Sequence, residues 1–147
     1  MTDNREIINS FFVRIFNKIL ALEEHAIGEE DISVNEVHII EAVAELAQCG
    51  ESTMKNIAKR LNLSAGATSV AVNTLVNKGY LRRENGLEDR RKIFIFITEK
   101  AQKAEKKHQD FHADMIHSIA ARLNEEELAT LSKSLISLEE YFGGLMH

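Results

Sequence analysis

Apolar residues recur along most of this chain with the spacing of helices, and they run together in only one short stretch. Between Arg5 and His25 they fall three or four positions apart, which predicts a helix with a wide apolar stripe. Ser33 followed by Glu36 has the pattern of a capping box and predicts a second helix that ends near Ala47. The chain is therefore expected to start with two amphipathic helices.

A closely spaced pair of helices is predicted next. Ser52 is the expected N-cap of a short helix whose apolar residues continue to Leu61, and Asn62 allows a tight turn. Ser64 is expected to cap a further helix that ends at Gly79, because glycine accepts the left-handed backbone found after a helix. Two short helices joined by such a turn predict a helix-turn-helix.

Two short strands are predicted after this pair, at residues 80–83 and 92–97. The isoleucines and phenylalanines of the second segment are typical of a strand. A long helix is expected from Thr98 to about Leu123, and Asn124 starts a last helix whose acidic first turn suits the helix dipole. The predicted fold is mainly α with a small β-hairpin wing, a winged helix-turn-helix flanked by long helices.

The charge of the chain is unevenly distributed. The 147 residues carry a net charge of −5, yet the segment from Ser52 to Lys100 has ten basic and four acidic residues, a net +6. The rest of the chain therefore carries −11. Because the local field governs attraction to phosphate, a basic segment containing the helix pair and the hairpin indicates double-stranded DNA as a partner.

The second helix of a helix-turn-helix enters the major groove by its N-terminal turns. Outward-facing residues with small or polar side chains are the expected DNA contacts, namely Ser64, Ala65, Gly66, Ser69 and Asn73. Hydroxyl and amide groups can bind phosphates or base edges, and alanine methyls can contact thymine. This helix has no arginine, so we expect the hairpin to supply much of the affinity.

The hairpin tip is the most basic part of the segment, with Asp89, Arg90, Arg91 and Lys92 in succession. Arginine at a hairpin tip suits insertion into a narrow, A·T-rich minor groove. Asp89 is expected to pair with Arg91 and hold the geometry of the tip. The alternative is an exposed hairpin whose charges only keep the protein in solution, or a winged helix that binds protein alone.

Several short motifs resemble those of one bacterial family. Lys78-Gly79-Tyr80, Asp89-Arg90-Arg91 and Ile97-Thr98-Glu99-Lys100 are similar to motifs of the MarR family of transcription regulators. The resemblance implies a homodimer formed by the first and last helices that binds a pseudo-palindromic operator. Val70 is a departure, because many relatives have a polar residue at this position.

The resemblance also implies a single domain, residues 1–147, with separate DNA-binding and dimerising parts. Residues 33–100 would form the DNA-binding core, and residues 1–30 and 101–147 would dimerise. No enzyme activity is expected, since Gln109 stands where a zinc hydrolase helix carries its glutamate base.

Four residues suggest a possible zinc site. His108 and His112 lie four positions apart on one helix, and Glu24 and His38 could complete the set. The same four positions match those of zinc-responsive repressors of metal uptake in the MarR family. The alternative is that these histidines only satisfy hydrogen bonds in a half-buried interface.

A second resemblance is to the FabT subgroup, repressors of fatty-acid synthesis. It rests on Asn9, Ile15-Phe16-Asn17, Glu23-Glu24, Asp31-Ile32-Ser33, Glu36-Val37-His38 and the residues from His108 to His112. It implies an acyl-chain effector delivered on acyl carrier protein. Apolar residues available for an effector pocket are Phe12, Ile15, Phe16, Ile19, Ile39, Ile40 and Phe111, which would equally form a plain core. Arg82, Arg83, Lys106 and Lys107 are possible contacts for the acidic carrier.

The remaining features bear on location and cofactors. Cys49 is the single cysteine, which excludes an internal disulfide and suits a reducing cytoplasm. No signal peptide and no run of about 18 apolar residues is found, so we expect a cytoplasmic protein without a membrane partner. No cofactor is expected to be required.

Overall fold

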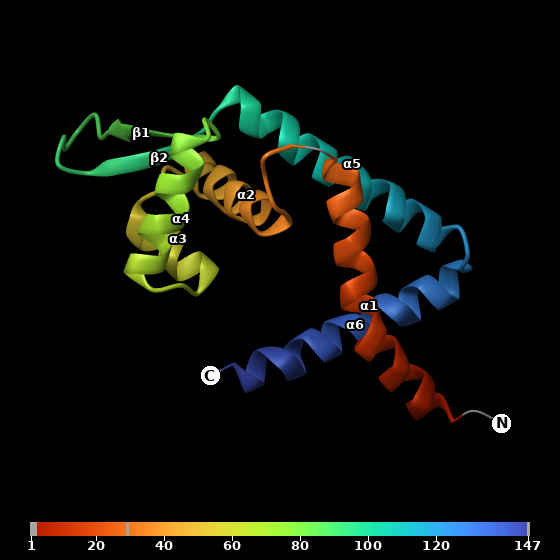
Figure 1. Ribbon diagram of the computed structural model, residues 1–147. Coiled ribbons are helices and arrows are strands. Elements are labelled where there is room, and N and C mark those ends of the chain that lie inside the picture. The colour runs from red at the N-terminus through yellow and green to blue at the C-terminus, as the bar shows by residue number, and fades with distance from the viewer. Residues whose placement is uncertain (1–2, 29, 147) are drawn as a thin grey trace. The chain divides into compact units, whose positions relative to one another are not determined.

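The computed structural model describes residues 3–28 and 30–146, which form six helices and one hairpin (Figure 1). In chain order the elements are α1 (Asn4–Ile27), α2 (Val34–Gln48), α3 (Met54–Leu61), α4 (Ala65–Asn77), β1 (Leu81–Asn85), β2 (Ile93–Ile97), α5 (Glu99–Ala120) and α6 (Glu125–Leu145). The chain divides into two compact units, the second beginning at Asp110. Across the described residues, no helix is long and apolar enough to cross a membrane.

The predicted helix starts are confirmed wherever a side chain caps the backbone locally. Ser33 and Glu36 form the expected capping box at α2, with each side chain bonded to the other residue's backbone N–H. Ser64 Oγ accepts a hydrogen bond from the backbone N–H of Ala67 and starts α4. Gly79, at φ +85°, ends the turn after α4 in the left-handed region.

The predicted cap of α3 was wrong by one residue. Thr53 is the N-cap, and its hydroxyl accepts a hydrogen bond from the backbone N–H of Asn56. Ser52 is instead completely buried, and its carbonyl oxygen accepts a hydrogen bond from the N–H of Ile95 on β2. Ser52 is therefore part of a short extended segment beside the hairpin, a role that depends on a strand more than 40 residues away.

A single apolar core holds the helix-turn-helix and the hairpin together. Side chains from α2, α3, α4 and β2 are completely buried in it, including Val37, Val43, Ile57, Val72 and Ile95. Each of these residues removes apolar surface from water, which stabilises the fold by about 1.5–3 kcal/mol per side chain. Because α4 contributes Val72 to this core, its opposite face is turned to solvent.

The hairpin is antiparallel and strongly asymmetric. Leu81 is opposite Ile97, and Asn85 is opposite Ile93, so the pairing runs the full length of both strands. Leu81 and Ile95 are buried on the inner face, while the residues towards the tip are exposed. The hairpin thus has an apolar base and a polar tip that extends beyond α3 and α4 (Figure 1).

A polar cluster connects the segment before α2 with the end of α4 and the start of α5. The hydroxyl of Tyr80 donates to Asp31 Oδ1 at 2.6 Å, and Lys100 Nζ lies 3.5 Å from the same carboxylate. These contacts hold the pKa of Asp31 below its ordinary value, the hydrogen bond from Tyr80 being the largest cause. Lys78 Nζ binds Glu36 and the backbone carbonyl of Asp31, so its charge is used inside the protein.

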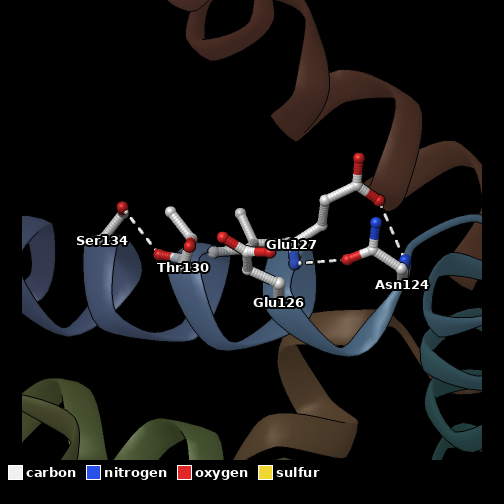
Figure 2. Close-up of a pocket in the computed structure, with 6 residues that line it drawn as sticks. Asn124, Glu126, Glu127, Thr130 and Ser134 are labelled. Atoms are coloured by element: carbon white, nitrogen blue, oxygen red, sulfur yellow. Dashed lines mark hydrogen bonds between the residues drawn. The ribbon is translucent and has the colours of Figure 1, made fainter.

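The second unit contains the end of α5 and the whole of α6. Asn124 and Glu127 form a reciprocal capping box at the start of α6, and Ser134 bonds back to the carbonyl of Thr130 (Figure 2). The predicted start of this helix is confirmed. No described residue of α6 is buried, although every third or fourth position is apolar.

Candidate nucleic-acid interface and effector site

The outer face of α4 carries the residues predicted to contact DNA. Thr68, Val72 and Leu75, which are spaced by three or four residues, are buried on the inner face. Outward-facing residues are Ala65, Gly66 and Asn73, which are exposed, together with the half-buried Ser69. The exposed Ser64 uses its oxygen as the helix cap, and its hydroxyl hydrogen can still donate to DNA. The structure therefore places all five predicted residues along one accessible face.

The wing tip has the predicted brace. Asp89 Oδ1 accepts hydrogen bonds from the backbone N–H and from Nε of Arg91, at 3.0 and 3.3 Å. The side chain of Arg91 is 93% exposed, so its guanidinium projects from the tip. Arg90 and Lys92 are also exposed. The tip presents three cations, and the carboxylate restrains one of them.

The backbone of the tip is closed by a turn from Asp89 to Lys92 that packs against Gly86. The N–H of Gly86 donates to the carbonyl of Lys92 at 2.8 Å, and the N–H of Lys92 donates to the carbonyl of Asp89 at 3.1 Å. A Cβ on Gly86 would lie 2.6 Å from the carbonyl oxygen of Asp89. Only glycine fits this position, since that distance is far below a van der Waals contact.

Two neighbouring arginines of β1 have different environments. Arg82 pairs with Glu84 and lies 4.9 Å from the centre of the Phe96 ring. Arg83 instead reaches α4, where its guanidinium donates a hydrogen bond to Oδ1 of Asn73. Arg83 is not among the DNA contacts predicted from sequence, because its bond to Asn73 joins two elements whose relative position no local pattern predicts.

His108 on α5 is buried between two carboxylates. Its Nε2 is 3.0 Å from Glu23 Oε1, and its Nδ1 is 2.5 Å from Glu41 Oε1. His108 and Glu23 are almost completely buried. Burial, and then the nearby Glu41 carboxylate, raise the pKa of Glu105 on the same helix. Two carboxylates, those of Glu23 and Glu41, thus flank the ring of His108.

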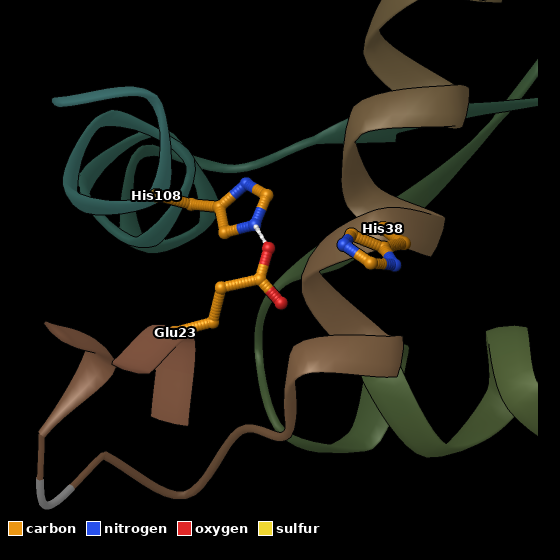
Figure 3. A group of neighbouring side chains, drawn as sticks. All are labelled: Glu23, His38 and His108. Atoms are coloured by element: carbon orange, nitrogen blue, oxygen red, sulfur yellow. Dashed lines mark hydrogen bonds and ion pairs between the residues drawn. The ribbon is translucent and has the colours of Figure 1, made fainter. Parts of the chain in front are cut away.

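His38 on α2 completes a group that could hold a metal ion. One ligand atom from each of Glu23, His38 and His108 lies within 4.8 Å of the others (Figure 3). Two histidines of the predicted set, His38 and His108, lie in this group, whereas Glu24 is exposed and outside it. His112 belongs to the second unit, where its ring packs against Phe111 with centroids 5.2 Å apart.

A regular spacing along α1 could have identified Glu23. Ile15, Ile19 and Ile27 are spaced by four and are half-buried or buried, and Glu23 occupies the missing place in that series. Residues four apart lie on one helix face, so Glu23 must face inward with its apolar neighbours. Glu24 is turned by about 100° from that face.

The group has suitable donor atoms for zinc, but these atoms lie farther apart than the ligand atoms of a zinc site. Two imidazoles and a carboxylate are the ligand set of many three-ligand zinc sites, and Glu41 could orient His108 from behind. Ligand atoms around tetrahedral zinc lie roughly 3.3 Å apart, given bonds of about 2.0–2.1 Å. The observed separations of up to 4.8 Å would have to close through small side-chain movements.

The residues predicted to line an effector pocket are spread over three helices. Half-buried members are Phe12, Ile15, Ile19 and Ile39, while Phe16 is 71% exposed. Ile40 is completely buried in the core, which supports the plain-core alternative for this residue. Phe111 is half-buried in the second unit. Within the first unit, an apolar strip on α1 is the accessible part of the predicted lining.

This geometry agrees with what comparisons with known proteins show. Residues 30–92, which contain the helix-turn-helix and most of the wing, match the MarR family. The structure superposes with a TM-score of 0.84 on FabT of Streptococcus pneumoniae, solved in complex with DNA. That match has 28% sequence identity and covers 97% of this chain and 99% of FabT. The chain is a MarR-type winged helix-turn-helix regulator.

One further relative and one further structure are similar to this chain. The HTH-type transcriptional regulator YwhA of Bacillus subtilis is 30% identical over 91 residues, which are 62% of this chain and 66% of YwhA. The structure of an S. aureus MepR–DNA complex shares the fold, with a TM-score of 0.71 and 20% identity over 90% of this chain and 96% of that chain. The protein is a MarR-type DNA-binding transcriptional regulator and not an enzyme.

Proposed function

We propose that the protein is a dimeric repressor of fatty-acid synthesis genes that responds to acyl chains carried on acyl carrier protein. The observation that carries the proposal is the similarity to FabT, which extends over 97% of the chain and includes the wing and both terminal helices. The proposed DNA site is a pseudo-palindrome, because a two-fold symmetric dimer presents two identical recognition helices. A cytoplasmic location remains a prediction.

Exposed apolar faces on the terminal helices support the dimer. Along α6, Leu131, Leu135, Phe142 and Leu145 are 39–65% exposed, and they follow the spacing of a helix–helix contact. On α1, Phe11 and other apolar side chains are similarly exposed. A face of this size on a soluble regulator marks an interaction site, and a second copy of the same chain can cover it.

The accessible apolar strip on α1 supports the acyl effector. Phe12, Ile15 and Ile19 lie along one face of α1, and the exposed Phe16 lies beside them. An acyl chain against these side chains would gain about 0.8 kcal/mol for each CH₂ group buried. Binding of the chain would therefore compete with the contacts that α1 makes in the dimer, and so could change the spacing of the two recognition helices.

The residues predicted to dock acyl carrier protein already have partners. Arg82 pairs with Glu84, and Lys107 Nζ lies 2.5 Å from Glu30. An acidic carrier would have to displace these carboxylates, so each cation contributes less to docking than a solvated one. Lys106 of the predicted patch is exposed.

A second candidate is a zinc-responsive repressor of metal uptake. The group of Glu23, His38 and His108 supports it, since three suitable ligand atoms come from three helices. A metal there would connect α1, α2 and α5, which is the kind of contact that could stabilise one dimer geometry. This candidate makes the effector a cation rather than an acyl chain.

DNA binding is tested by fluorescence anisotropy with A·T-rich palindromic duplexes at several salt concentrations. We expect salt-dependent binding that Arg91→Ala weakens and Lys133→Ala, which removes an exposed charge on α6, does not. Absence of binding, or equal binding by Arg91→Ala and the unchanged protein, would argue against an operator-binding regulator.

The effector is tested with the same operator duplex. A change in affinity with long-chain acyl carrier protein, and none with the unacylated carrier, supports the fatty-acid role. A response to zinc that a chelator reverses, and that His38→Ala abolishes but His25→Ala does not, would favour metal sensing instead. His38 suits this test because it is exposed, so its replacement leaves the core intact.

A further inference from the structure

We propose that Arg83 on β1 binds a DNA backbone phosphate at the rim of the major groove, and that Asn73 on α4 holds its guanidinium in place. The proposal rests on the DNA-binding part of the proposed function and is independent of the effector. It adds one cationic contact between the recognition helix and the wing.

The register of the hairpin explains why Arg83 reaches α4. Arg83 is opposite Ile95, and both lie on the face of the hairpin that covers the core. Its neighbour Arg82 is opposite Phe96 and lies on the other face, where it pairs with Glu84. Arg83 extends along the inner face past the edge of the core, where it meets the exposed outer side of α4.

The chemistry of the contact determines the orientation of Asn73. A guanidinium has only donors, so the amide oxygen of Asn73 must face Arg83. Bidentate recognition of adenine needs both the oxygen and the NH₂ group of an asparagine. Because Arg83 engages the oxygen, Asn73 is arranged to position the guanidinium and to donate from its NH₂ group, rather than to bind adenine with both groups.

The position along α4 favours a phosphate over a base edge as the partner of Arg83. Asn73 lies eight residues after Ala65, about 12 Å along the helix axis, whereas base edges are contacted by the first turns of a recognition helix. At that distance the helix leaves the groove floor and meets the phosphate backbone.

The charge distribution gives Arg83 a specific place in the interface. Helix α4 contains no lysine or arginine between Ala65 and Asn77. Lys78, directly after it, binds Glu36 and Asp31. Arg83 therefore supplies a cation on the outer side of α4, where a backbone phosphate would otherwise meet only neutral side chains. Its side chain is exposed, so no rearrangement of the core is needed for contact with DNA.

The test is the salt dependence of DNA binding by Arg83→Gln and Arg83→Lys. Glutamine can still donate to Asn73 but has no charge, whereas lysine keeps the charge. For Arg83→Gln we expect operator and random duplexes to bind about eightfold more weakly per subunit at 0.1 M salt. The slope of log K against log [salt] should become shallower by about 0.9 per subunit. Arg83→Lys should keep most of the slope.

Arg82→Gln is the matched control, because it removes the neighbouring charge from the opposite face and should leave the slope unchanged. As a single substitution, Asn73→Ala should weaken DNA binding. It should have little further effect in a protein that already carries Arg83→Gln. An unchanged slope for Arg83→Gln, or a loss confined to the operator, overturns the phosphate contact. If the protein without substitutions binds no DNA at all, the proposed DNA-binding function is wrong as well as the role of Arg83.

Discussion

Single residues determine the shape of the wing and the charge around the buried His108. Gly86 is the position where the tip of the hairpin closes most tightly, since a Cβ there would collide with the backbone of Asp89. Glu23 and Glu41 flank the buried His108, and burial makes the ionised form of nearby Glu105 on the same helix costly. Both positions therefore allow predictions that depend on one side chain.

Gly86→Ala is expected to displace the wing tip. The new methyl group would be 2.6 Å from the carbonyl oxygen of Asp89 and 3.1 Å from the ring of Phe94, so the turn must open. Operator affinity should fall while helix content, measured by circular dichroism, stays the same. Gly143→Ala, where a Cβ meets nothing within 4 Å, is the control. Equal affinities for both variants would show that the tip tolerates the displacement.

Glu105→Gln is expected to stabilise the protein at neutral pH. The pKa of Glu105 is raised in the folded state by burial and by Glu41, so ionisation lowers the free energy of unfolding as pH rises through that pKa. Below pH 4.5 the carboxyl group is protonated in both states, and the advantage of glutamine disappears. Melting temperatures at pH 7 and pH 4 measure this, with the exposed Glu126→Gln as control. A variant less stable at pH 7 would contradict the assignment.

Elements were predictable where their limits depend on neighbouring residues. The capping boxes at α2 and α6 and the left-handed glycine after α4 were identified because each involves contacts within a few positions of the chain. The start of α3 was shifted because two consecutive hydroxyl residues precede it, and pairing with β2 decides which one caps. Because a distant strand decides which residue caps the helix, local helix propensity could not predict it.

The two hydroxyl residues before α3 should respond oppositely to alanine. Thr53→Ala removes the N-cap and should lower the free energy of unfolding by about 1 kcal/mol. Ser52→Ala removes a buried hydroxyl that has no hydrogen-bond partner among the described residues, so stability should be unchanged or higher. Urea unfolding of both variants tests this. A larger loss for Ser52→Ala would mean that its hydroxyl has a partner such as a buried water.

At the scale of the whole molecule, each unit contains surface that one chain leaves exposed. The first unit exposes the apolar side of α1, and the second exposes the whole of α6. The DNA-binding elements, in contrast, have a closed core of their own. This contrast is expected of a regulator in which one part folds around its own core while the terminal helices depend on a second copy.

Leu135→Glu is expected to convert the protein to a monomer. The residue lies in the middle of the exposed apolar stripe of α6, and a buried carboxylate at an interface is costly. Light scattering should show half the mass, and operator affinity should fall by about 100-fold or more because the two half-sites are no longer bound together.

Leu87→Glu is the matched control for this experiment, since Leu87 is a fully exposed leucine on the wing. It should keep the mass of the dimer. A dimer that persists in Leu135→Glu would exclude α6 as the main dimer contact.

The sequence alone determined the order of the helices, the hairpin, the basic segment and the brace between Asp89 and Arg91. These features follow from spacing and from bonds between near neighbours, which hold wherever the segment lies in the fold. Tertiary structure decided that Glu23 rather than Glu24 faces His108, and that Arg83 meets Asn73. The physical reason is that each contact joins two elements that are separate in the chain. Helical spacing can show that Glu23 faces inward, but only the packing of distant elements decides which side chain it meets.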